Sequence, residues 1–351
     1  MTSRRRFIVS SAAVAAITTL PGSRFPACAA NRPFVFVSWG GALSDAEKRA
    51  FMDPFSQQHG TEVINTSPTE YAKLKAMVAS GNVEWDLVTV GGRFVFEGEE
   101  VLAALDYQKI PNAGALEEGW KAEKGIATST GATIIAWNTK TFPDGNTPQS
   151  WVDFWDVKRF PGPRGLYKPF YYNYEAALLA AGLKREEIYP VTDERVEMAI
   201  GKLKELKPNV QVWWSSGAQP PQLLSSGELA LSSAWSGRMI AIEAEQAPTG
   251  FTFNDGIAWA NWMVVPKGSP NTDLAMAVIN YALSEEAQTK LLDLGIYGPV
   301  VGSVTEKATP EQRKNLVMTP ENIKTMLVLD EKQAALYSSK YQERWNEFQL
   351  G

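Results

Sequence analysis

The stretch PFVFVSWGG, residues 33–41, sets the pattern that decides the fold. Residues 33–38 form a nearly continuous apolar run, which is typical of a buried strand, and the Gly pair that follows favours a turn. A helix is expected next, from about Asp45 to Gln58. This β-turn-α unit recurs, with strands at 62–64 and 85–90, a helix at 70–80 and a loop at 91–93. Strands that alternate with helices predict an α/β fold with a mainly parallel sheet.

The rest of the chain continues this alternation and predicts a second lobe. Further strands are expected at 132–138, 210–214, 226–235 and 259–266, helices at 174–181, 193–206, 272–282 and 285–292, and a helical tail at about 310–350. A Pro- and Gly-rich segment at 142–148 favours a crossing between lobes, and the strand at 259–266 is expected to return. The predicted lobes are residues 31–137 with 262–305, and residues 138–261 with 306–351.

The N-terminal residues predict export across a membrane. The sequence RRRF at 4–7 precedes an apolar run too short to span a bilayer, and it resembles the twin-arginine export motif. A small-x-small pattern ends at Ala29, so a signal peptide of residues 1–30 is expected, cleaved near Ala29-Ala30 to leave a periplasmic protein. The alternative is a lipoprotein acylated on Cys28, although the usual aliphatic residue three places ahead of that cysteine is missing.

Composition excludes several classes of function. Cleavage after Ala29 removes four arginines and the only cysteine, so the mature chain carries 30 Lys and Arg against 39 acids, a net charge near −9. Nucleic acid is therefore not an expected partner. The sequence holds a single histidine, no Gly-x-Ser-x-Gly elbow, no Walker loop and no metal-spaced His/Cys cluster. We expect no cofactor, no metal and no enzymatic activity.

The first candidate site residues follow the predicted strands. In open α/β sheets, ligands collect beyond the carboxyl ends of the strands. Trp39 and Gly40 follow the first strand, and Gly91 and Arg93 follow the strand at 85–90. These residues are our first candidates for a ligand site.

Several stretches in order resemble a known family. They are residues 38–41, 85–88, 131–139, 227–237 and 259–266. Together they resemble the periplasmic solute-binding proteins of the spermidine/putrescine type, which deliver small molecules to ATP-driven importers. The resemblance implies a type II fold of two α/β lobes joined by two crossings, closing over a small ligand by a hinge motion. It also implies a monomer whose partners are the permease and ATPase subunits of an ABC importer.

The same resemblance nominates aromatic ligand contacts. In the family, aromatic side chains from both lobes hold the ligand, and the matching residues here are Trp39, Trp235, Trp259 and Tyr297. The departures concern charge. Where polyamine binders carry an Asp two residues beyond the second-lobe Trp, this chain has Asn261, and Tyr172 stands near the place of an acidic pair.

Arginines replace those acids and predict the ligand. Arg93 stands where the family tends to have Tyr, and Arg238 follows the Trp235 strand. Because Arg suits bidentate recognition of carboxylate, we expect a carboxylate-bearing or zwitterionic amine, such as a γ-aminobutyrate-like amino acid or an amino-acid conjugate. Either arginine also has a structural interpretation, in which it pairs with an acid of the protein. If an ammonium group is also bound, Glu175 and Asp255 are the nearby acids that we consider for it.

Other functions stay open from sequence alone. A polyamine ligand is the first alternative, and a ferric ion held by tyrosines of the run at 170–174 is a more remote one. An exported hydrolase such as a glycosidase would also have an aromatic cleft flanked by carboxylates. A receptor that signals to a membrane sensor, rather than feeding a permease, would have the same sequence features.

Overall fold

The apolar strands at the start of the chain pair as parallel neighbours, as the alternation of strands and helices predicts. The computed structural model describes residues 32–143 and 145–351. The predicted signal peptide and its cleavage site lie outside the described residues. The strands are β1 (Phe34–Val37), β2 (Val63–Thr66), β3 (Leu87–Gly91), β4 (Lys121–Ala122), β5 (Gly125–Asn138), β6 (Arg164–Tyr167), β7 (Val210–Trp214), β8 (Leu231–Trp235), β9 (Thr249–Val264) and β10 (Leu327–Val328).

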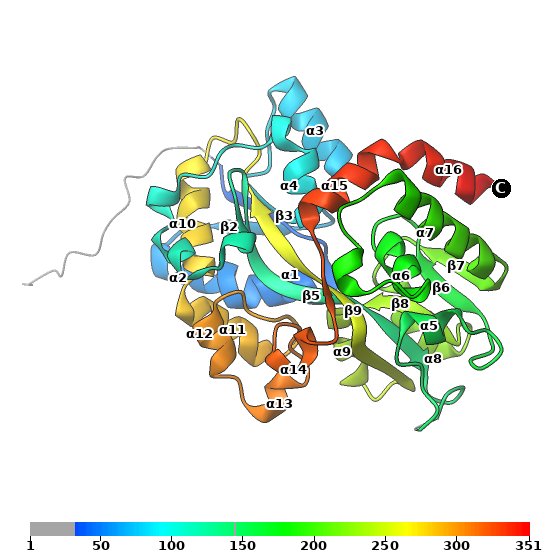
Figure 1. Cartoon of the computed structure of the whole chain (residues 1–351). Coiled ribbons are helices and arrows are strands. Elements are labelled where there is room, and N and C mark those ends of the chain that lie inside the picture. The colour runs from blue at the N-terminus through cyan, green and yellow to red at the C-terminus, as the bar shows by residue number, and fades with distance from the viewer. Residues whose placement is uncertain (1–31, 144) are drawn as a thin grey trace, which may run out of the picture. The chain divides into compact units, whose positions relative to one another are not determined.

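One sheet contains all of these strands. Its order is β2-β1-β3-β9-β5-β8-β6-β7, with β10 beside β9 and β4 beside β5. Pairing is parallel in both flanks, where β1 joins β2 and β3, and β6 joins β7 and β8. Pairing is antiparallel in the middle, where β9 joins β3 and β5, and β5 joins β8. The predicted α/β class is confirmed, with the parallel strands gathered at the two ends of the sheet (Figure 1).

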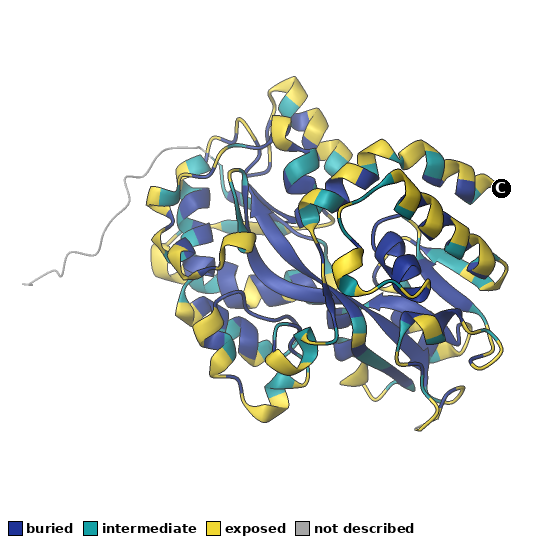
Figure 2. Cartoon of the chain, in the orientation of Figure 1, coloured by how far each residue is buried: buried dark blue, intermediate teal, exposed yellow. Residues whose placement is uncertain are grey.

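Helices surround the sheet, and its central strands β5 and β9 are mostly buried (Figure 2). They are α1 (Gly41–Glu47), α2 (Asp53–His59), α3 (Tyr71–Ser80), α4 (Gly92–Glu97), α5 (Trp151–Trp155), α6 (Asn173–Ala180), α7 (Asp193–Leu206), α8 (Gln219–Ser226), α9 (Ser236–Glu243), α10 (Thr272–Ala282), α11 (Glu285–Leu294), α12 (Gly302–Glu306), α13 (Pro310–Arg313), α14 (Pro320–Ile323), α15 (Glu331–Lys340) and α16 (Gln342–Leu350). A π-helical turn, Lys48–Met52, joins α1 to α2.

Helix α7 shows how a capping residue and the spacing of apolar residues mark a helix in the sequence. The side chain of Thr192 caps its first turn by accepting a hydrogen bond from the N–H of Arg195. Residues Val196, Ala199, Ile200 and Leu203 then recur at helical spacing and are buried along one face. The predicted bounds of α7 and α10 are confirmed.

Strands β5 and β9 are much longer than their predicted cores at 132–138 and 259–266. β5 spans 14 residues that are all buried, and β9 spans 16 residues that pair antiparallel with it. The missed parts are rich in Thr, Ser and Gly, so they lack the apolar run that marks a strand. Some of their polar groups are hydrogen-bonded inside the sheet, as where the hydroxyl of Ser129 accepts from the amide of Asn261 at 3.0 Å.

Two local predictions are wrong. The predicted loop at 91–93 instead comprises the last residue of β3, Gly91, and the start of α4. Gly92 is needed there because a Cβ would lie 2.5 Å from Nε1 of Trp262. The predicted helical tail is broken into short helices and β10, which pairs with β9. That tail also does not pack only on the predicted second lobe, because α15 contacts α4 while α16 contacts α7.

Residues 32–351 pack as one compact unit, and the bounds of the two lobes stay a prediction. Among the described helices, none is both long enough and apolar enough to span a bilayer.

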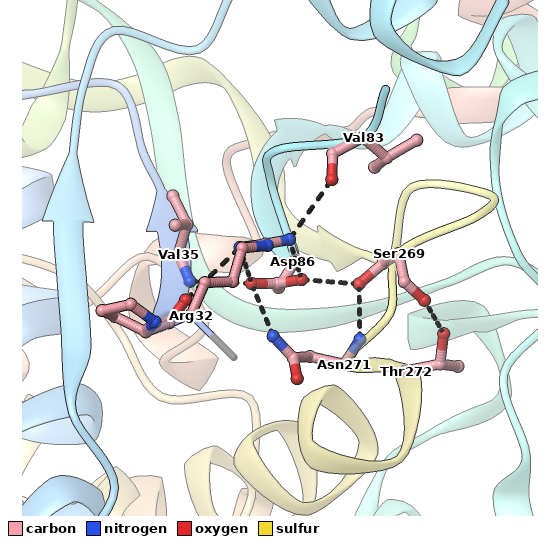
Figure 3. A network of polar contacts seen from close by, with 8 residues as sticks. Arg32, Val35, Val83, Asp86, Ser269, Asn271 and Thr272 are labelled. Atoms are coloured by element: carbon pink, nitrogen blue, oxygen red, sulfur yellow. Dashed lines mark hydrogen bonds and ion pairs between the residues drawn. The ribbon is translucent and has the colours of Figure 1, made fainter. Parts of the chain in front are cut away.

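A buried carboxylate, that of Asp86, accepts hydrogen bonds from the start of β1 and from the turn before α10 (Figure 3). Asp86 is fully buried, and its two oxygens each accept a hydrogen bond of 2.8 Å from the guanidinium of Arg32. The same carboxylate accepts from the N–H of Val35, from the hydroxyl of Ser269 at 2.7 Å and from the amide of Asn271 at 3.1 Å. Asp86 therefore ties the segment before β1 to the turn before α10.

Three buried glutamates make stability depend on pH. Burial raises the pKa of Glu47 and Glu175 to about 7 and that of Glu331 to about 8, although each carboxyl group accepts hydrogen bonds. Because these folded-state pKa values exceed the unfolded values, the folded chain binds more protons in this range. The contribution of these three groups to stability is therefore fully present below about pH 4.5. It is lost as pH rises to about 7 for Glu47 and Glu175 and to about 8 for Glu331, by roughly 1.4 kcal/mol per pH unit for each group.

We therefore expect the unfolding temperature to fall as pH rises from 5 to 8.5, measured by scanning calorimetry. Glu175→Gln should make this decline shallower below about pH 7, because the neutral amide does not titrate and can still accept hydrogen bonds from the hydroxyls of Tyr189 and Tyr337, which lie 2.9 Å and 3.0 Å from the carboxylate. An unfolding temperature that rises across this pH range would contradict the assignment.

Candidate ligand-binding site

A small cavity of about 80 Å³ lies where several strands end. Trp39 follows β1, Gly91 ends β3 and Trp235 ends β8, as expected for the ligand edge of an α/β sheet. Nine predicted residues line the cavity: Trp39, Gly91, Arg93, Tyr172, Trp235, Arg238, Trp259, Asn261 and Tyr297. The tenth, Gly40, lies next to it and accepts a hydrogen bond of 2.8 Å from Arg238.

The walls of the cavity are aromatic. The ring of Trp39 meets that of Tyr71 edge to face, with centroids 5.7 Å apart. The ring centroids of Trp259 and Tyr172 lie 6.3 Å apart, and Nε1 of Trp259 donates to the hydroxyl of Thr133 at 3.1 Å. Gly131 makes room for this indole, since a Cβ there would lie 2.4 Å from its ring. These contacts hold flat apolar faces in fixed positions around the cavity.

Five lining residues were not predicted: Leu43, Tyr71, Tyr167, Tyr171 and Ala260. Tyr71 begins helix α3, whereas our rule considered only residues that follow strands. Tyr167 does end a strand, but β6 was not predicted because it opens with Arg164. That arginine is buried and donates to main-chain carbonyl oxygens such as that of Phe154.

Tyr172 reaches the cavity through a strained backbone. Its φ of 69° lies in the left-handed region, which non-glycine residues seldom adopt, and it forms the N-cap of α6. Its ring packs against that of Tyr171, with centroids 3.9 Å apart. Strain of this kind persists where surrounding contacts hold it, often at ligand sites.

The charge of Arg93 is already balanced within the protein. Its Nη1 lies 2.9 Å and 2.7 Å from the two carboxylate oxygens of Glu97, one turn along α4. Its guanidinium also sits 5.0 Å from the ring centre of Tyr171. The structural interpretation of Arg93 therefore accounts for its charge, although the side chain still lines the cavity.

Arg238 differs from Arg93. Its Nη2 donates to the carbonyl of Gly40, while its Nε is buried and has no hydrogen-bond partner in the described structure. No carboxylate within residues 32–143 or 145–351 forms an ion pair with it. Gly41 makes room for the guanidinium, because a Cβ there would lie 2.0 Å from Nη1. A guanidinium at a cavity without a balancing acid is costly, and a bound anion would offset that cost.

The acids that we considered for an ammonium group lie elsewhere. Glu175 is fully buried and accepts hydrogen bonds from tyrosine hydroxyls. Asp255 lies within β9, where its carboxylate is 3.9 Å from the guanidinium of Arg185. Neither lines the cavity, so that suggestion was wrong. The lining residues of the described chain include no carboxylate at all.

Across the residues that the structure describes, no group of three or more His, Cys, Asp and Glu side chains could hold an ion. The tyrosine run at 170–174 instead supplies two walls of the cavity and the start of α6.

Comparison with known proteins agrees with this geometry. Residues 50–319 match the family model described as "Bacterial extracellular solute-binding protein". The chain is 33% identical over 323 residues to a gamma-aminobutyric acid-binding protein of Pseudomonas aeruginosa, covering 91% of each. It is 29% identical over 299 residues to a spermidine/putrescine-binding periplasmic protein of Haemophilus influenzae, covering 81% of this chain and 79% of the relative.

Comparison with solved structures also finds solute-binding proteins. An ABC transporter substrate-binding protein from Bradyrhizobium japonicum superposes with a TM-score of 0.83 at 35% identity, covering 90% of this chain and 99% of that structure.

Proposed function

We propose that this chain, which belongs to the family of bacterial extracellular solute-binding proteins, binds a small zwitterion. The ligand carries a carboxylate and an ammonium group, as γ-aminobutyrate does. The family role is that of a substrate-binding component of an ABC transporter. Arg238 is the observation that carries the choice of ligand. Its guanidinium reaches the cavity without a balancing acid, and a ligand carboxylate would supply that balance.

The charge of the cavity disfavours a polyamine. Arg93 is neutralised by Glu97, which leaves the positive charge of Arg238 at a cavity lined by no carboxylate of the described residues. A diamine would bring two more positive charges next to it. A zwitterion instead places its negative end at the guanidinium. The greater identity to the γ-aminobutyric acid-binding relative than to the spermidine/putrescine-binding one supports the same choice.

The remaining site residues take roles that follow from their positions. Trp39, Trp235, Trp259, Tyr172 and Tyr297 offer aromatic faces to the methylene chain and the ammonium group. Gly91 and Asn261 offer polar groups, and Gly40 positions Arg238 by accepting its hydrogen bond.

We propose that capture works by closure of two lobes. The lobes are those predicted from the sequence, residues 31–137 with 262–305 and residues 138–261 with 306–351. Arg238 on α9 and Gly40 after β1 belong to different predicted lobes, so their hydrogen bond would join the lobes in a closed form. We further propose that the mature protein is a periplasmic monomer that delivers its ligand to permease and ATPase subunits.

A thermal-shift screen of the mature protein tests the ligand class. The panel contains ω-amino acids, α-amino acids, amino-acid conjugates and polyamines. A ligand at 100 times its dissociation constant stabilises the protein by about 2.7 kcal/mol, so binders stand out. We expect shifts from acid-bearing amines and none from putrescine or spermidine. Analysis of the ligand after incubation separates the hydrolase alternative, since a receptor returns it unchanged.

Asn261→Asp should shift the preference toward diamines. The variant places a carboxylate at a lining position that is almost fully buried, where it can pair with a ligand ammonium. We expect calorimetry to show putrescine binding at least about tenfold tighter than in the unmodified protein, or about 1.4 kcal/mol. Asn254→Asp is the matched control, because Asn254 lies on the same strand but is exposed and outside the cavity. Unchanged putrescine affinity in Asn261→Asp would argue against this position as a ligand contact.

A further inference from the structure

The proposed zwitterion brings an ammonium group into a cavity whose lining residues, all of them described, include no carboxylate. Aromatic faces attract a cation, but they do not neutralise its charge once water is removed. A carboxylate directly behind the lining would neutralise it, provided that a lining residue connects that carboxylate to the cavity. The acids that contact the lining from behind therefore decide where the ammonium group binds.

Glu331 is the acid, among the residues described, that accepts a hydrogen bond from an uncharged side chain of the lining. It lies in the first turn of α15, and its Oε2 accepts from the hydroxyl of Tyr171 at 2.7 Å. Gly92 permits this position, because a Cβ there would lie 2.6 Å from Cδ of Glu331. The other oxygen, Oε1, is buried and accepts no hydrogen bond within the described structure. Since the hydroxyl of Tyr171 donates to Glu331, its oxygen can still accept from a ligand.

The other acids near the cavity lack this connection. Glu97 is held by Arg93, whose charge it balances. Glu47 accepts from the hydroxyls of Ser38 and Thr89, neither of which lines the cavity. Both carboxyl groups are therefore already occupied by donors of the protein.

The charge of Glu331 acts on two tyrosines of the cavity. Burial raises the pKa of Tyr171 and that of Tyr172, and the negative charge of Glu331 raises both further. An anion that disfavours a phenolate at these hydroxyls favours a cation at the same place. The side of the cavity formed by Tyr171 and Tyr172 is therefore the side that suits an ammonium group.

Glu331 holds a proton at neutral pH when no ligand is bound, because burial raises its pKa to about 8. Hydrogen bonds from Tyr171 and from the N–H of Arg93 lower this pKa, as does the charge of Arg93, while the charge of Glu175 raises it. The titratable and charged groups that face Glu331 are Arg93, Tyr171, Tyr172, Glu175 and Tyr189. A ligand ammonium would add a positive charge to this set and favour the carboxylate form.

We propose that Glu331, acting through Tyr171, is the positioning residue for the ammonium group of the ligand, and that ligand binding releases the proton of Glu331. The O–H bond of the carboxyl group breaks and its proton passes to solvent. The resulting carboxylate accepts from Tyr171, whose oxygen accepts from the ammonium group. The inference rests on the proposed function, because it needs an amine ligand in the cavity. It goes further by naming the counter-charge of that amine.

Calorimetric titration of the mature protein with γ-aminobutyrate counts the released protons when it is repeated at pH 7 in buffers of different ionisation enthalpy. We expect release of about half a proton or more per ligand bound. The ligand itself contributes no proton, because its carboxyl and amino groups titrate near pH 4 and pH 10, roughly three units away.

Glu331→Gln should abolish this release and make the loss of affinity depend on pH. At pH 8.5 the unmodified protein already holds a carboxylate, so we expect the variant to bind γ-aminobutyrate at least about tenfold more weakly. At pH 6 the unmodified protein must first lose its proton, so the difference should shrink to a few-fold. Tyr171→Phe, which removes the connecting hydroxyl, should also abolish the release.

Glu175→Gln is the matched control. Glu175 is also a buried glutamate that accepts from tyrosine hydroxyls, but those of Tyr189 and Tyr337, which do not line the cavity. We expect this variant to keep its affinity within about twofold and to keep the proton release. Thermal unfolding of each variant checks that the fold is kept.

The possible failures are distinct. If γ-aminobutyrate binds without releasing a proton, the inference is overturned and the proposed function stands. The same holds if Glu331→Gln weakens binding equally at pH 6 and pH 8.5, since a purely structural role would produce that result. If no acid-bearing amine binds at all, the proposed function itself is wrong.

Discussion

Arg238→Ala is expected to weaken the binding of γ-aminobutyrate by about 100-fold or more, close to 3 kcal/mol. The guanidinium is the one cation of the cavity, within the described residues, that no carboxylate of the protein balances. Its removal would leave the ligand carboxylate desolvated without a partner, which is the costly half of breaking a buried pair. Calorimetric titration of the variant measures the loss directly.

Controls separate this effect from damage to the fold. Arg238→Lys keeps the charge but loses the planar fork, so we expect an intermediate affinity. Unfolding free energy should fall by no more than about 2 kcal/mol in Arg238→Ala, because the lost protein contact is a single hydrogen bond to the carbonyl of Gly40. Near-normal affinity in Arg238→Ala would remove the main support for an acid-bearing ligand.

Asp86→Ala is expected to lower the free energy of unfolding by about 3–5 kcal/mol. The carboxylate is fully buried and accepts from Arg32, Val35, Ser269 and Asn271 (Figure 3). Its removal leaves these donors, of which Ser269 and Asn271 are buried, without this acceptor. Chemical denaturation with linear extrapolation provides the measurement.

Arg32→Met is the matched control for Asp86. The side chain of Arg32 is about one-third exposed, at 31%, whereas Asp86 keeps its other hydrogen bonds when the arginine is removed. We expect a smaller loss than for Asp86→Ala. A loss below about 1 kcal/mol in Asp86→Ala would show that the donors find other partners.

Elements with a clear apolar period could be predicted from the sequence. Helix α7 is an example, since a capping Thr192 and a buried stripe of four residues mark both its start and its inner face. The extensions of β5 and β9 could not be predicted, because their Thr, Ser and Gly residues become buried only through pairing between distant segments. Periodicity within one segment carries no information about such pairing.

The same distinction applies to the site. The rule that ligands gather beyond strand ends nominated Trp39, Gly91 and Arg93, and all three line one cavity. It missed Tyr71, which reaches the cavity from the start of a helix. It also gave no means of telling Arg93 from Arg238, because the balancing Glu97 lies one helical turn beyond Arg93 in α4, a helix that was not predicted.

The central claim is that the cavity selects a ligand with a carboxylate at one end and a cationic nitrogen at the other. The most direct test is calorimetric titration of the mature protein with three compounds of equal chain length: γ-aminobutyrate, putrescine and butyrate. We predict saturable one-to-one binding of γ-aminobutyrate, and binding of the other two at least about 100-fold weaker, since each lacks one of the two charged groups. Tight binding of putrescine together with no binding of γ-aminobutyrate would contradict the claim.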